Sequence, residues 1–113
     1  MTEQTTLTLF GEATPDGVIM RCSGRLVSST ADRLKHEARP HILRGRSFVL
    51  DLSEVTFMDS MGLGTIAGLW VSSRNALCQI EVVNLSPRIR DLFTVTNMLS
   101  LFEPAGGANA RIL

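Results

Sequence analysis

Residues Val49–Gly68 read VLDLSEVTFMDSMGLGTIAG, and the change of pattern inside this stretch decides the fold. Phe48–Leu52 is apolar almost throughout, which predicts a central strand covered on both faces. A polar connection follows, and after Ser60 the apolar residues recur with a helical period. The hydroxyl of Ser60 is therefore expected at a helix N-terminus. Unpaired backbone N–H groups and the positive end of the helix dipole favour a phosphate there.

The rest of the chain predicts an α/β domain with the element order β-β-α-β-α-β-α. Thr14–Gly17 is a turn signal that makes the first two strands an antiparallel hairpin. The later alternation of strand and helix requires right-handed crossovers and a mainly parallel sheet. We expect strands at 6–11, 18–23, 48–52 and 78–84, and helices at about 31–38, 60–76 and 87–96.

Several finer expectations concern the helices and the tail. Ser28, Ser29 or Thr30 is expected to cap the first helix and Pro40 to end it, with Ile42 and Leu43 adding a last packed turn. Ser86 is expected to cap the third helix, with Pro87 at its first position.

Residues 99–102 are expected to form an edge strand or a final helix, and 104–113 a flexible tail. The expected core arc of the second helix consists of Leu63, Ile66, Leu69, Trp70, Ser73 and Leu77.

Length, charge and cysteine content limit the classes of function that the chain could have. The 113 residues form one domain, 1–113, with a core at about 7–102. Eleven basic and eleven acidic residues cancel, so no excess positive charge is available for nucleic acid or an anionic membrane. No apolar run reaches the roughly 20 residues of a membrane span, and the N-terminus does not resemble a signal peptide. Cys22 and Cys78 are expected to be buried thiols in a reducing, cytoplasmic setting.

Catalytic and cofactor sites were weighed and set aside. Gly62–Gly68 has the pattern G-x-G-x-x-x-G, but its expected strand ends several residues earlier, at about Leu52, and the chain is short for a dinucleotide domain. Asp51, Glu54 and Asp59 could hold magnesium, but turn and capping roles are the simpler interpretation. No cysteine, histidine or nucleophile set is evident. We expect no enzyme activity, no metal and no cofactor.

One face of the helix after Ser60 carries few charges. Solvated helix faces normally carry Glu and Lys, so a smooth strip beside the serine indicates a docking surface. The other interpretation is that a further segment, such as the tail, covers the strip. Its members are Met61, Gly64, Thr65, Gly68 and Ser72.

The sequence resembles the STAS domain family, the anti-sigma factor antagonists and their relatives in sulfate transporters. The resemblance spans about Leu7–Phe102 and is strongest at Met58–Gly64, MDSMGLG, which is similar to the family's M-D-S-x-G-L-G phosphorylation loop. Supporting stretches are Gly24-Arg25-Leu26 before Thr30-Ala31, and Val83–Pro87 with Val95-Thr96 downstream.

The resemblance implies a mixed sheet of four or five strands with helices mainly on one side. It implies that the protein binds an anti-sigma factor that is also a GHKL-type serine kinase. Phosphorylation of Ser60 would release the antagonist, and a serine phosphatase would reverse it. The expected partner-binding residues are Arg25, Ser28, Asp59, Ser60, Met61, Gly62, Gly64, Thr65 and Gly68.

Alternatives remain open at this point. Ser60 could be only an N-cap, and the domain could be an unphosphorylated scaffold subunit of a signalling or membrane-associated transport complex. A nucleotide-binding or enzymatic α/β domain is a third class. An exposed edge on the opening hairpin would permit a homodimer by strand addition, but does not demand one. The family often has G-E-L-D where this chain has Gly24–Val27, GRLV, so the resemblance does not identify the partner kinase.

Overall fold

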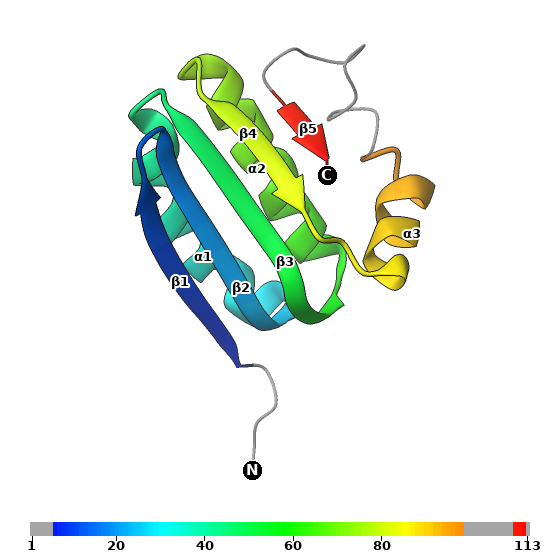
Figure 1. Cartoon of the computed structure of the whole chain (residues 1–113). Helices are drawn as coiled ribbons and strands as arrows, with labels where there is room; N and C mark the ends of the chain where they lie inside the picture. The colour runs from blue at the N-terminus through cyan, green and yellow to red at the C-terminus, as the bar shows by residue number, and fades with distance from the viewer. Residues whose placement is uncertain (1–5, 99–109, 113) are drawn as a thin grey trace.

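A computed structural model describes residues 6–98 and 110–112 and shows a single mixed sheet (Figure 1). The strand order is β1-β2-β3-β4-β5, with β1 and β2 antiparallel and every later pair parallel. This confirms the predicted α/β class and the opening hairpin. The elements are β1 (Leu7–Thr14), β2 (Gly17–Leu26), α1 (Ser28–Leu43), β3 (Ser47–Met58), α2 (Ser60–Asn75), β4 (Gln79–Val83), α3 (Pro87–Val95) and β5 (Ala110–Ile112).

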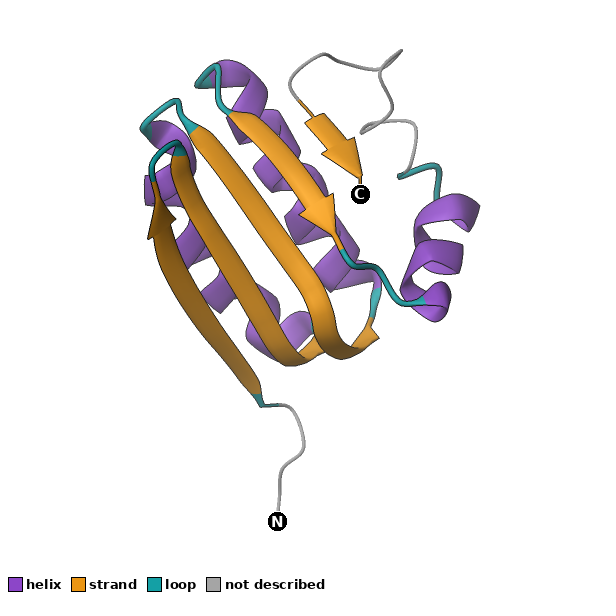
Figure 2. Ribbon diagram, viewed as in Figure 1, coloured by secondary structure: helices purple, strands orange, loops and turns teal. Residues whose placement is uncertain are grey.

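The helices α1 and α2 lie side by side on one face of the sheet, and the core fills the space between the layers (Figure 2). Leu34 of α1, Leu50 of β3 and Ile66 of α2 are fully buried in this core. Each such side chain stabilises the fold by roughly 1.5–3 kcal/mol. No helix of the described residues covers the opposite face of the sheet. Within the described residues, helices therefore lie against one face of the sheet, as the resemblance implied, and no helix covers the second face of Phe48–Leu52.

β3 is much longer than predicted. Residues 53–58 were expected as a polar connection, but the strand runs to Met58. β2 supplies the partner, pairing Gly24 with Val55 and Leu26 with Met58 after shifts of register. Val55 and Met58 are buried but lie three residues apart. Because a regular strand alternates with a period of two, this bulged pairing hides the strand signal from a pattern search.

Proline does not end α1, contrary to expectation. The helix continues through Pro40 to Leu43. Pro40 costs about 3 kcal/mol in a helix interior, but Ile42, the next-to-last residue of the helix, is fully buried and contributes roughly 1.5–3 kcal/mol of stability. Ile42 therefore forms the packed turn that we expected, whereas Leu43 is 57% exposed.

The ends of the other helices partly follow the prediction. Ser86 caps α3 by accepting a hydrogen bond from Ile89 N at 3.3 Å, and Pro87 is the first residue, as expected. α2 ends at Asn75, so Leu77 leaves the expected core arc and is 85% exposed. Of the expected tail, 110–112 forms β5 beside β4. The expectations for 99–102 and 104–109 lie outside the described residues.

Candidate functional site

The predicted phosphoacceptor, Ser60, is the first residue of α2 and its side chain is exposed to solvent. It is not the N-cap. Asp59 occupies that position, with its Oδ1 accepting hydrogen bonds from Met61 N and Gly62 N, both at 3.0 Å. The interpretation of Ser60 as a cap is therefore wrong. Because another residue caps the helix, the hydroxyl of Ser60 is left to the surface.

Asp59 also reaches the neighbouring helix. Its Oδ2 accepts a hydrogen bond from Ser28 N, at 3.2 Å, and Ser28 is the first residue of α1. The residue before Ser28, Val27, is the N-cap, and the Thr30 hydroxyl accepts a bond from Val27 N at 3.0 Å. Ser28, Ser29 and Thr30 were the expected caps, and of these only Thr30 takes part, from inside the helix. The carboxylate thus holds two helix N-termini together.

Gly62 allows the first turn of α2 to lie close to the end of β2. A Cβ atom on Gly62 would come within 2.4 Å of the carbonyl oxygen of Leu26, so only glycine fits this contact. Asp59 N also donates to Leu26 O, at 3.3 Å. Gly62 was expected to contact a partner, but it is buried. The close contact of Gly62 with Leu26 brings the start of α2, which carries Ser60, close to the start of α1, which carries Ser28.

Arg25, one of the expected partner-binding residues, lies at the end of β2. Its guanidinium lies over the ring of Phe57 in β3, 4.6 Å from the ring centroid. Arg25 Nε is buried and has no hydrogen-bond partner among the described residues. The cation is therefore held against an aromatic face. It lies on the same strand end as the Leu26 carbonyl that Gly62 approaches.

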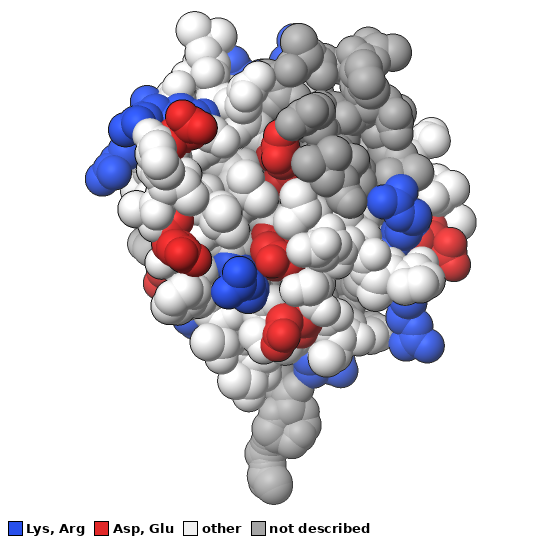
Figure 3. All heavy atoms as spheres, viewed as in Figure 1, with Lys and Arg blue, Asp and Glu red and all other residues white. Residues whose placement is uncertain are grey.

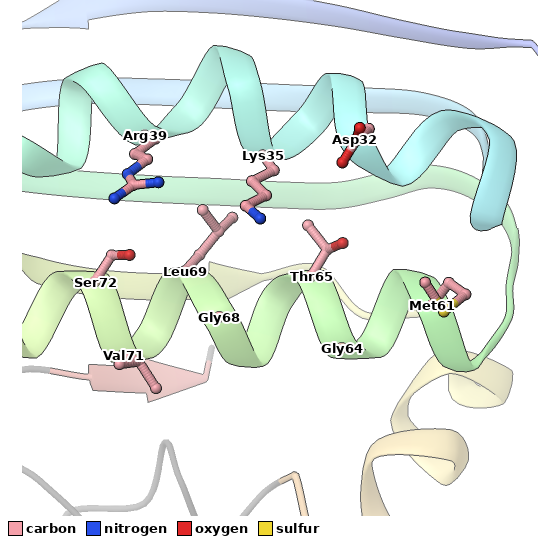
Figure 4. A pocket seen from close by; sticks show the side chains of 10 residues that line it. All are labelled: Asp32, Lys35, Arg39, Met61, Gly64, Thr65, Gly68, Leu69, Val71 and Ser72. Carbon is pink, nitrogen blue, oxygen red and sulfur yellow. The ribbon is translucent and has the colours of Figure 1, made fainter.

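A groove of about 520 Å³ runs between α1 and α2 from the Ser60 end of the helices (Figure 4). On the α2 side, Gly64 and Gly68 leave open space, since a Cβ on either would meet nothing within 4 Å. On the α1 side, Lys35 and Arg39 extend toward α2 (Figure 4). The lining is Asp32, Lys35, Arg39, Met61, Gly64, Thr65, Gly68, Leu69, Val71 and Ser72.

The predicted smooth strip is thus one wall of a groove. Every residue of the strip lines it, and neither neighbouring helix of the described part covers it. The charged wall on α1 was missed by the sequence analysis. The signal was available, because Asp32, Lys35 and Arg39 recur at three and four residues and so share one face of α1.

The open face of the sheet carries a separate polar cluster around Asp51. Arg21 Nε lies 3.3 Å from Asp51 Oδ2, while Ser53 N and Asn84 Nδ2 donate to Oδ1 at 2.9 and 3.3 Å. Burial raises the pKa of Asp51, but these hydrogen bonds together hold it below its ordinary value. Figure 3 shows acidic groups spread over this face. The cluster joins β2, β3 and the end of β4.

The alternatives weighed on sequence can now be placed. Asp51 and Asp59 have separate partners, and the described residues contain no group of three or more potential metal ligands. One ground against a dinucleotide site was wrong, because β3 reaches Met58, directly before Asp59. Cys22 and Cys78 are buried and form no disulfide within the described residues. None of the helices within the described residues has the length and apolar character needed to cross a membrane.

The fold and site define a two-layer α/β domain whose sheet positions a serine at the start of a helix. The STAS domain family matches residues 12–107, and the chain belongs to this family. It is 29% identical to an anti-sigma-B factor antagonist of Listeria monocytogenes over 93 residues, which cover 81% of this chain and 82% of that protein.

Solved structures agree with this fold. An anti-sigma factor antagonist from Mycobacterium paratuberculosis has a TM-score of 0.76 at 22% identity, covering 87% of this chain and 84% of that one. SpoIIAA in its unphosphorylated form has a TM-score of 0.68 at 19% identity, covering 96% and 87%. SpoIIAA of Bacillus in its phosphorylated form has a TM-score of 0.66 at 19% identity, covering 96% and 91%.

Proposed function

We propose that the protein is an anti-sigma factor antagonist. In this proposal it binds an anti-sigma factor with GHKL-type serine kinase activity and is switched off by phosphorylation of Ser60. The observation that carries the proposal is the exposed Ser60 at the first position of α2, beside a groove that the described helices leave open. The names of the Listeria and Mycobacterium relatives and the phosphorylated SpoIIAA structure support it.

The switch would act through charge rather than through unfolding. A phosphate on Ser60 adds about −1.5 to −2 charges at neutral pH. On sequence we expected free N–H groups to receive it, but Asp59 already accepts from Met61 N and Gly62 N. The phosphate would therefore lie beside a carboxylate that keeps its own partners. The fold should tolerate this at the exposed helix start, whereas a partner docked there would face a concentrated negative charge.

Transfer of a phosphoryl group is the first test. The protein is incubated with ATP and, one at a time, with the purified GHKL-type serine kinases of its source organism. We expect the intact mass to rise by one phosphoryl group, with fragmentation placing it on Ser60, and a serine phosphatase to reverse the gain. Ser60→Ala should gain nothing, whereas Ser29→Ala, at the exposed start of α1 and outside the expected partner-binding residues, should be modified normally.

The outcomes separate the alternatives. A stable complex without any gain in mass would favour the unphosphorylated scaffold over the switch. An equal gain in Ser60→Ala would show that another residue is the acceptor. Binding supplies the second readout, since Ser60→Asp should bind the kinase at least tenfold more weakly than Ser60→Ala, at a similar melting temperature. If Ser60→Asp binds as the wild type does, the charge switch is wrong.

The groove can be tested separately from the serine. Gly64→Gln places a long uncharged side chain in open space, so the fold should be unaffected while the partner is kept out. We expect loss of kinase binding with an unchanged unfolding curve. The matched control is Ser29→Gln on the exposed start of α1, outside the groove lining. Unchanged binding by Gly64→Gln would place the partner elsewhere.

A further inference from the structure

The outer edge of β1 offers a row of backbone hydrogen-bonding groups. β1 lies at one end of the sheet and pairs with β2 along its whole length without a bulge. Arg25 N donates to Thr6 O at 3.0 Å, which makes Thr6 and Arg25 a hydrogen-bonded pair. Because such pairs alternate in an antiparallel ladder, the N–H and C=O groups of Leu7, Leu9, Gly11 and Ala13 point away from β2.

Natural edge strands are normally protected against pairing with another chain. Within residues 6–98 and 110–112, protection of this edge by a hydrogen bond is found at the beginning of β1, where Arg33 of α1 donates to the outward carbonyl of Leu7. From Thr8 to Thr14 the strand contains no proline and no lysine, and Glu12 is its one charged residue. At its centre, Phe10 is 57% exposed. The edge from Leu9 to Ala13 is therefore open and partly apolar.

We infer that this edge pairs with β1 of a second copy of the chain, giving a two-fold symmetric dimer with one continuous sheet. An antiparallel pairing centred on Phe10 fits the outward groups, since Leu9 of one copy meets Gly11 of the other and exchanges both backbone hydrogen bonds. The two Phe10 rings then face each other in a non-hydrogen-bonded pair, where side chains are closest.

The charges favour a second copy in this register. Glu12 lies opposite Thr8 of the other copy, so the single carboxylate of the strand meets a hydroxyl rather than its own equivalent. All four helices α1 and α2 of the dimer lie on the same side of the continuous sheet, because a two-fold axis perpendicular to the sheet preserves its faces. This pairing uses none of the residues that line the groove or surround Ser60, and it is independent of the proposed function.

Gly11 provides a matched pair of variants. Gly11→Pro removes an outward N–H group without touching the bonds to β2, and proline is tolerated on edge strands. Gly11→Ala keeps the N–H, and its Cβ would meet only Met20 Cε at an ordinary 3.8 Å. Sedimentation equilibrium over a range of concentrations should show the wild type and Gly11→Ala passing from one chain to two. Gly11→Pro should form the dimer only at a concentration roughly tenfold or more higher, because it cannot donate the outward backbone hydrogen bonds to the second copy.

A charge exchange tests the register without changing the backbone. Thr8→Glu places a carboxylate opposite Glu12 of the other copy and should weaken the dimer, while Thr8→Glu/Glu12→Lys should restore it. Circular dichroism checks that each variant is folded. A wild-type protein that remains monomeric at its highest soluble concentration would overturn the inference. The edge of β1 would then be available for a strand from another protein. Equal dimerisation of the wild type, Gly11→Pro and Thr8→Glu would also overturn it, by placing the interface on another surface.

Discussion

The carboxylate of Asp59 and the backbone N–H of Ser28 are joined by a hydrogen bond of 3.2 Å, although the residues lie 31 positions apart in the chain. The same carboxylate caps α2, so one side chain connects the first turns of two parallel helices. Ser28 and Ser60 therefore both lie next to the negatively charged carboxylate of Asp59. Any change to Asp59 should affect both helices and the surface between them.

Asp59→Ala should lower the free energy of unfolding by about 1–2 kcal/mol, since an N-cap is lost together with the bond to α1. Urea denaturation measures this directly. Ser86→Ala is the control, because the side chain of Ser86 caps α3 by accepting a hydrogen bond from Ile89 N within the same helix. We expect its loss to be the smaller of the two. Equal losses would show that the bridge to Ser28 contributes nothing.

Two glycines of the same helix should respond in opposite ways to alanine. Gly62→Ala should destabilise the protein by about 1–3 kcal/mol, because the new Cβ overlaps the Leu26 carbonyl and the first turn of α2 must move. Gly64→Ala meets open space and should be neutral or stabilise by up to about 1 kcal/mol through helix propensity. Thermal and urea unfolding of both variants gives the comparison. A tolerated Gly62→Ala would contradict the close contact.

Acid should weaken the protein partly through Asp51. Burial of Asp51 raises its pKa, but the hydrogen bonds from Ser53, Asn84 and Arg21 outweigh this and hold the folded pKa below the ordinary value. A depressed pKa contributes stability above the unfolded pKa of about 3.9, and this stability is lost as the pH falls through the folded value. Asp51→Asn should therefore cost about 1–2 kcal/mol at pH 7 and lose less stability below about pH 4.

The control for this pH dependence is Glu54→Gln, on the same strand but exposed. Its unfolding free energy should follow the wild-type curve at each pH, because its side chain is exposed to solvent and is not part of the Asp51 cluster. Urea unfolding at a series of pH values from neutral to acid supplies both curves. A wild type and an Asp51→Asn variant with parallel curves would show that the cluster does not stabilise the ionised carboxylate.

The thiols of Cys22 and Cys78 should not react with thiol reagents in the native protein. Burial raises the pKa of Cys22 to about 12, with the nearby charge of Asp51 adding to the shift, and burial also raises the pKa of Cys78. Since the thiolate is the reactive form, a disulfide reagent such as Ellman's should label neither residue at pH 8 in the folded state. Both should react after unfolding in urea. Rapid labelling of the native protein would indicate local opening of the core around β2.

Local patterns were enough for the order of the elements from β1 to α3. Turn residues at Thr14–Gly17 predicted the hairpin, the apolar run at Phe48–Leu52 predicted a buried strand, and Ser86-Pro87 predicted the start of α3. Each of these signals depends on neighbouring residues only, through backbone preference and side-chain period. The position of Ser60 at a helix start belongs to the same group. It needed only the change from a strand pattern to a helical one.

Tertiary contacts decided what the patterns could not. Residues 53–58 extend β3 because β2 offers a bulged partner, and α1 continues past Pro40 because Ile42 is buried. Folding also brought the start of α1 and the end of β2 against α2, so that Asp59 bonds to Ser28 N and Gly62 lies against the Leu26 carbonyl. Thus the sequence by itself determined the order of the elements from β1 to α3, but not β5, which forms at 110–112 where a flexible tail was expected. Only the tertiary structure decided where they end and which groups stay free, because both depend on contacts between residues far apart in the chain.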